Sequence, residues 1–183
     1  MCGKLFKRSV VENIKFKTFD IFIGDDQLFL MQVFPFIESI YITNLKGYNY
    51  RTGGGSGFYS KFFEDALKIY EFKKNEVKKN RLYEWEPYLF FELKNYFKSD
   101  LINKIKYKKE GKKGLLQYID SVVNTHLSEV VDYYRKEVPV SLQEPFVRAI
   151  INNDYEKVLE ICCNKLKKHR IQNYFRNIVI KYF

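Results

Sequence analysis

The glycine-rich run at residues 53–57 is the feature that most limits the possible folds, because the hydrophobic pattern has a different period on its two sides. Before the run, β-branched and aromatic residues form short stretches. After it, apolar residues recur every three or four positions. A period of two is typical of strands and a period near 3.6 is typical of helices. The run therefore predicts a joint between two kinds of secondary structure.

The residues before the joint predict a small antiparallel sheet. Residues 16–23 and 28–34 are rich in Phe, Ile, Leu and Val, and residues 24–27 (Gly-Asp-Asp-Gln) separate them with the spacing of a hairpin loop. Pro35 should end the second strand, because proline cannot donate to a ladder. Residues 39–45 follow as a third strand at meander spacing.

The residues after the joint predict several helices. One apolar stripe consists of Phe58, Phe62, Ala66, Ile69 and Tyr70. Pro87 marks the start of a second helix, whose stripe consists of Phe90, Leu93, Phe97, Leu101 and Ile105. The pattern from Leu116 to Tyr134 predicts a single third helix. Ser141 and Glu144 have the spacing of a capping box before a short helical pair. The last stripe, which begins at Ile171, is expected to dock on the core, with a helix facing a partner or a membrane as the alternative.

These patterns together predict an α+β protein. We expect a single domain over residues 1–183, with a β-rich part at 14–50, a glycine-rich connector at 51–57 and a helical part at 58–183. A chain of this length buries roughly 70% of the surface that it exposes when unfolded, so it can form a core without disulfide bonds or metals.

The chain has a formal net charge of +10, which favours phosphates, acidic proteins or anionic membranes as partners. The alternative is a compositional origin, because an AT-rich genome raises the Lys content without selection for a partner. The lysines and arginines that are candidates for a basic surface lie in two clusters: Lys108, Lys109, Lys112 and Lys113, and Lys167, Lys168, Arg170 and Arg176.

The glycine run could cradle a phosphate, because backbone N–H groups before a helix bind anions. It lacks the Gly-Lys-Ser/Thr ending of a P-loop and the spacing of a dinucleotide fold. A Gly-Ser pair that opens a helix also resembles the loop of nucleotidyltransferases, in which acidic residues shortly downstream hold metal ions. Here Glu64 and Asp65 are neighbours on different sides of a predicted helix, and no Asp-x-Asp or Asp-x-Glu pattern lies on a following strand. We therefore predict no cofactor and no nucleotide site.

No other motif predicts catalysis. Cys162 and His169 share a helical face, but two ligands do not make a metal site, and no metal is expected. The chain has three cysteines, no signal peptide at its start and no apolar run of the length of a membrane span. These features predict a cytoplasmic protein, more consistent with a binding protein than with an enzyme.

The functional hypothesis is a non-enzymatic protein-binding module of bacterial or phage origin. Its most specific form is an immunity or antitoxin protein that neutralises a toxin or effector by direct contact with an acidic surface. Aromatic residues and arginine dominate binding hot spots, so the predicted anchors are Tyr48, Tyr50, Arg51, Phe58, Tyr59 and Trp85. The alternative is a basic RNA- or DNA-binding protein, and the third possibility is an enzyme that binds a phosphorylated substrate at the glycine run.

Overall fold

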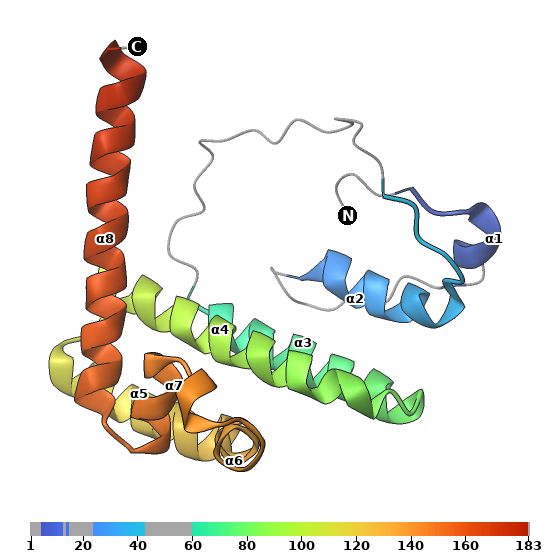
Figure 1. The fold of residues 1–183 in the computed structure, drawn as a ribbon, viewed down its shortest axis with the longest axis horizontal. Helices are drawn as coiled ribbons and strands as arrows, with labels where there is room; N and C mark the ends of the chain where they lie inside the picture. The colour runs from blue at the N-terminus through green and yellow to red at the C-terminus, as the bar shows by residue number, and fades with distance from the viewer. Residues whose placement is uncertain (1–4, 13, 15–23, 43–59, 183) are drawn as a thin grey trace. The chain divides into compact units, whose positions relative to one another are not determined.

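The computed structural model describes residues 5–12, 14, 24–42 and 60–182, and for residues 25, 169, 170 and 173–182 it describes the backbone alone (Figure 1). The chain divides into two compact units, Met1–Leu89 and Phe90–Phe183. The glycine run at residues 53–57 and the predicted strand at 16–23 lie outside the described residues.

The predicted α+β class is wrong, because the described residues form helices and contain no strand. Residues 28–34, predicted as a strand, belong to α2 (Asp25–Val33) and the 3-10 helix η1 (Phe34–Phe36). Of the predicted third strand, residues 39–42 are described and are not a strand. A short apolar run such as Leu28 to Met31 does not by itself distinguish a strand from a buried helix. Leu28 and Val33 are fully buried here as residues of a helix and not of a sheet.

The first unit contains α1 (Arg8–Val11), α2, η1, α3 (Phe62–Lys79) and η2 (Tyr83–Trp85). Helix α3 packs against α2 and buries Ala66, Ile69 and Tyr70, which confirms this part of the predicted stripe. The buried Lys73 reaches across the helix pair, where its Nζ donates to Gln27 Oε1 over 2.8 Å. A hydrogen bond thus adds to the apolar contact between these two helices.

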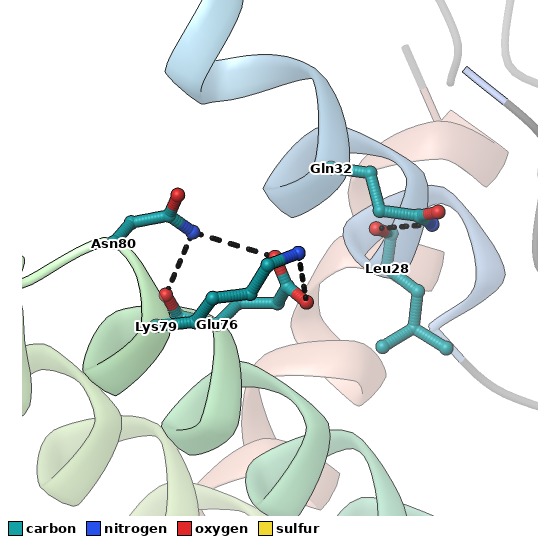
Figure 2. A network of polar contacts seen from close by, with 5 residues as sticks. All are labelled: Leu28, Gln32, Glu76, Lys79 and Asn80. Atoms are coloured by element: carbon teal, nitrogen blue, oxygen red, sulfur yellow. Dashed lines mark hydrogen bonds and ion pairs between the residues drawn. The ribbon is translucent and has the colours of Figure 1, made fainter.

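Side chains close the end of α3 with local hydrogen bonds (Figure 2). Asn80 Nδ2 donates to the carbonyl oxygen of Glu76 over 2.8 Å and to its carboxylate over 3.4 Å. The next turn is a Schellman motif, in which Leu82 N–H donates to Val77 O and Arg81 N–H donates to Lys78 O. Arg81 adopts a left-handed φ of 55° to make this turn.

The second unit begins within α4 (Glu86–Lys106) and continues with α5 (Lys112–His126), α6 (Ser128–Glu137), the 3-10 helix η3 (Val140–Leu142), α7 (Pro145–Ile151) and α8 (Tyr155–Tyr182). Helix α8 packs on α5 and α7, and α6 packs on the same two helices. On α4, Leu93, Phe97 and Leu101 are fully buried, as the sequence predicts. The ring of Phe97 contacts those of Tyr118 on α5 and Phe146 on α7.

Two local predictions in the second unit are wrong. The single helix expected from Leu116 to Tyr134 is broken at Leu127, which leaves the helical conformation (φ −107°, ψ 6°) and is itself buried in the core. The capping box is also absent. Ser141 lies inside η3, and Glu144 is the N-cap residue of α7 without a side-chain cap hydrogen bond, because its carboxylate binds two lysines of α4.

The predicted docking of the last stripe is wrong at its first residue. Burial along α8 stops near Leu166, and Ile171 is 57% exposed. Figure 1 shows α8 continuing well past the group formed by α5, α6 and α7. Among the described residues, none of the helices has the length and apolar character needed to cross a membrane.

Candidate partner-binding groove

Most of the predicted partner anchors cannot be placed. Tyr48, Tyr50, Arg51, Phe58 and Tyr59 lie outside the described residues. Trp85 lies in η2, partly buried, and its ring meets that of Phe34 edge-on at a centroid distance of 5.6 Å. This contact joins η2 to η1 within the first unit. A role of Trp85 in partner binding stays a prediction.

The predicted basic residues of the α4–α5 turn do form an exposed cluster. Six lysines and one glutamate lie between residues 104 and 113. Glu110 accepts a hydrogen bond from Lys104 over 3.0 Å, and the remaining five lysines are exposed: Lys106, Lys108, Lys109, Lys112 and Lys113. We call these five residues the basic turn. Of the second predicted cluster, Lys167 and Lys168 are exposed on α8, whereas the side chains of Arg170 and Arg176 are outside the described residues.

The backbone of the basic turn is fixed by a second Schellman motif. Lys109 N–H donates to Lys104 O over 3.2 Å, and Lys108 N–H donates to Ile105 O over 3.2 Å. This closure places Lys108 in the left-handed region at φ 50°, where glycine is the usual residue. The side chains of the turn are therefore presented from an ordered backbone.

An open groove of about 690 Å³ lies beside the basic turn. Its apolar surface comes from the end of α4, the start of α5 and the first turns of α8, through Ile105, Leu115, Leu159 and Cys163. Its charged rim consists of Lys112, Asp154, Glu156, Lys157 and Glu160. The groove therefore offers an apolar surface within reach of charged groups, which is the general character of a binding site.

The charges of the rim are largely paired with one another. Lys112 Nζ lies 2.9 Å from Glu156 Oε1, and Lys157 Nζ donates to Glu160 Oε2 over 2.8 Å, which raises the pKa of Lys157. Asp154 Oδ1 accepts the backbone N–H of Lys157 over 3.0 Å and so caps the start of α8. The three carboxylates of the rim would repel a phosphate inside the groove. Because Lys112 faces Glu156, the positive charge beside the groove comes from the other lysines of the basic turn: Lys106, Lys108, Lys109 and Lys113.

The two adjacent cysteines differ in environment. Cys162 is fully buried, and burial raises the pKa of its thiol to about 12. Cys163 is partly exposed at the groove. In the described part of the chain, no three His, Cys, Asp or Glu side chains gather in a way that could hold a metal ion. Cys163 is thus the thiol of this pair that a reagent in solution can reach.

A second charged cluster joins α4 to the start of α7. Glu144 accepts hydrogen bonds from Lys94 over 2.7 Å and from Lys98 over 3.2 Å, and Lys94 is only 2% exposed. Partial burial would raise the pKa of the Glu144 carboxyl, but the hydrogen bond and the charge of Lys94, together with Lys98, outweigh burial and lower the pKa. The ammonium of Lys94 also lies 4.4 Å from the Phe91 ring centre. These contacts are internal, so we assign this cluster a structural role.

Sequence reasoning identified the basic turn but missed the groove. The turn is a continuous segment, so its composition is visible directly. Ile105, Leu115 and Leu159 belong to three helices, and only packing brings them to one groove. One signal in the sequence could have pointed to the groove: the apolar stripe of each of these helices ends beside charged residues.

No protein family, curated protein or solved structure matched this chain in the three comparisons made.

Proposed function

We propose that this chain is a non-enzymatic protein-binding module that acts in the cytoplasm and holds an acidic partner at the groove and the basic turn. In its most specific form it is an immunity or antitoxin protein that neutralises a toxin or effector by direct binding. The observation that carries the proposal is the position of the exposed basic turn beside an open groove with an apolar surface.

The groove and the turn would recognise different parts of one partner segment. An aliphatic or aromatic side chain would pack against the partly exposed Ile105 and the edges of Leu115 and Leu159, which are otherwise buried, and neighbouring carboxylates would face Lys108 and Lys109. Charge complementarity of this kind sets specificity and association rate, and the buried apolar contact supplies affinity. A nucleic acid fits less well, because the groove carries carboxylates at its rim and aliphatic residues where stacking would require aromatic rings.

Selection of a random peptide library on the full chain tests the proposal. We expect enriched peptides to carry an apolar residue flanked by Asp or Glu. Fluorescence polarisation of one labelled peptide should show about tenfold or greater weakening by K108E/K109E. The matched control K61E/K78E removes the same charge from exposed lysines of the first unit and should change affinity less than about twofold.

Alkylation with N-ethylmaleimide tests the groove separately in a Cys2→Ser background. The reagent should modify Cys163 and spare the buried Cys162, and the bulky product should abolish peptide binding. The Cys2→Ser/Cys163→Ser variant, treated identically, should retain binding. If no peptide is enriched, or if alkylation and K108E/K109E both leave affinity unchanged, the proposal is wrong. Tight oligonucleotide binding with a steep salt dependence would instead favour a nucleic-acid-binding protein.

A further inference from the structure

The two halves of α8 present their apolar residues on opposite sides. The first half is buried through Val158, Leu159 and Cys162. Ile171 lies nine residues beyond Cys162, which is about two and a half turns of an α-helix, so its position is on the opposite side of α8. The helix cannot bury both sides against the same group of neighbours.

The second half carries an amphipathic pattern of its own. Positions 175, 178 and 182 share the side of Ile171, and they hold Phe, Ile and Tyr. Ile171 is 57% exposed, and Lys167, Lys168 and Gln172 beside it are exposed. The helix therefore extends past its last buried neighbours with an apolar side that the core does not cover at Ile171.

The charge of this segment has one sign. Residues 161–183 contain no Asp or Glu and six Lys or Arg residues: Lys165, Lys167, Lys168, Arg170, Arg176 and Lys181. Two copies of such a helix would repel each other, which argues against self-association through it. A cationic amphipathic helix with aromatic residues in its apolar stripe has the composition of a helix that lies in the surface of an anionic bilayer.

We propose that residues 171–182 of α8 bind anionic lipid surfaces, with the side of Ile171 and Phe175 in the acyl boundary. Arg170, Arg176 and Lys181 occupy positions off this side and would lie among the headgroups. Lys167 and Lys168 share the side of Ile171 one turn earlier, so they would meet the headgroups where α8 leaves the bilayer surface. Tyrosine suits this position because its ring is apolar and its hydroxyl stays hydrated. The site is separate from the groove. In combination with the function proposed above, on which this step rests, it would bring the bound partner of the groove to a membrane surface.

Co-sedimentation of the full chain with vesicles tests the proposal. We expect binding to phosphatidylcholine vesicles that contain about one third phosphatidylglycerol, and at least about tenfold weaker binding to phosphatidylcholine alone. F175D/I178D should abolish binding. The matched control N173D/N177D introduces the same two carboxylates on the other side of α8 and should retain most of it.

Two further measurements make the result decisive. Hydrogen exchange over residues 171–182 should slow when anionic vesicles are added, and circular dichroism should show that both variants remain folded. If the full chain does not bind anionic vesicles at low salt, the proposal is wrong, and an acidic protein surface becomes the better occupant. Equal loss of binding in F175D/I178D and N173D/N177D would also overturn it, since charge alone would then explain the attraction.

Discussion

At the scale of single residues, Gly24 shows how one position fixes a helix start. It precedes α2 in the left-handed region at φ 82°, and an added Cβ would collide with Cδ1 of Ile69 and lie 3.3 Å from its Cγ1. Ile69 is fully buried, so it has little space to move. Both the backbone conformation and the contact with α3 therefore require glycine at this position.

We expect Gly24→Ala to lower the free energy of unfolding by about 2–4 kcal/mol, from the strained φ and the overpacked core together. Urea denaturation measures this change. The control is Gly114→Ala in the first turn of α5, where the added Cβ meets only Glu110 at ordinary contact distance. The control should stabilise the protein by about 0.5–1 kcal/mol. Equal effects of the two variants would contradict this account.

Two basic residues occupy helix ends where glycine would be less strained. Arg81 and Lys108 have left-handed φ values in the Schellman motifs that close α3 and α4. A residue with a side chain pays about 1–2 kcal/mol to adopt this conformation. Glycine would relieve this strain, but it loses more backbone entropy on folding, and that loss offsets part of the gain.

Arg81→Gly and Lys108→Gly should each stabilise the protein by about 0.5–1 kcal/mol in urea denaturation. The comparison variants Arg81→Ala and Lys108→Ala remove the same side chains without relieving φ, so they should give no gain. If the alanine variants stabilise as much as the glycine variants, the strain lies in the side chains and not in the backbone.

At the scale of secondary-structure elements, Glu144 connects the start of α7 to α4 through Lys94 and Lys98. Glu144→Gln would leave the nearly buried Lys94 without its charged acceptor. We expect a loss of about 1–2 kcal/mol at neutral pH, moderated because Glu144 itself is partly exposed. The control Glu156→Gln breaks an ion pair between two exposed side chains and should cost less than about 0.5 kcal/mol.

The effect of Glu144→Gln should depend on pH in one direction. The pKa of Glu144 is lower in the folded protein than its ordinary value of 4.5. Its ionised form is therefore favoured by folding, and the stabilisation is present above pH 4.5 and is lost as the pH falls through the folded pKa. The difference between the original chain and Glu144→Gln should shrink accordingly in denaturation at acidic pH. A difference that grows on acidification would contradict the assigned charges.

The sequence predicted elements best where one helical face repeats over several turns. The stripes through Ile69 on α3 and Phe97 on α4 repeat at local spacing, so they could be predicted without knowledge of packing. The strand predicted over residues 28–34 was wrong because the continuous apolar run from Leu28 to Met31 fits a strand or a buried helix equally well. The capping box predicted for Glu144 was wrong because a capping box is a local pattern, whereas the partners of Glu144 on α4 are 46 and 50 residues away in the sequence.

At the scale of the whole molecule, the net charge of +10 should make stability depend on salt. Repulsion among surplus lysines opposes compaction, and raising NaCl from about 0.01 M to about 0.15 M shortens the Debye length from about 30 Å to about 8 Å. Exposed ion pairs such as Lys112 with Glu156 weaken at the same time, but each contributes little. We therefore expect Tm to rise by about 2–4 °C, which corresponds to about 1 kcal/mol for a chain of this size.

A charge-reversed variant separates this effect from other actions of salt. K108E/K109E/K167E/K168E replaces four exposed lysines with glutamates. Each substitution removes one positive charge and adds one negative charge, so the formal net charge falls from +10 to +2. Its Tm should change much less over the same NaCl range, because little net repulsion remains to be screened. If the Tm of the original chain falls as NaCl is added, ion pairs outweigh repulsion among the lysines. The surplus positive charge would then not destabilise the fold, and an acidic partner would have no repulsion to relieve.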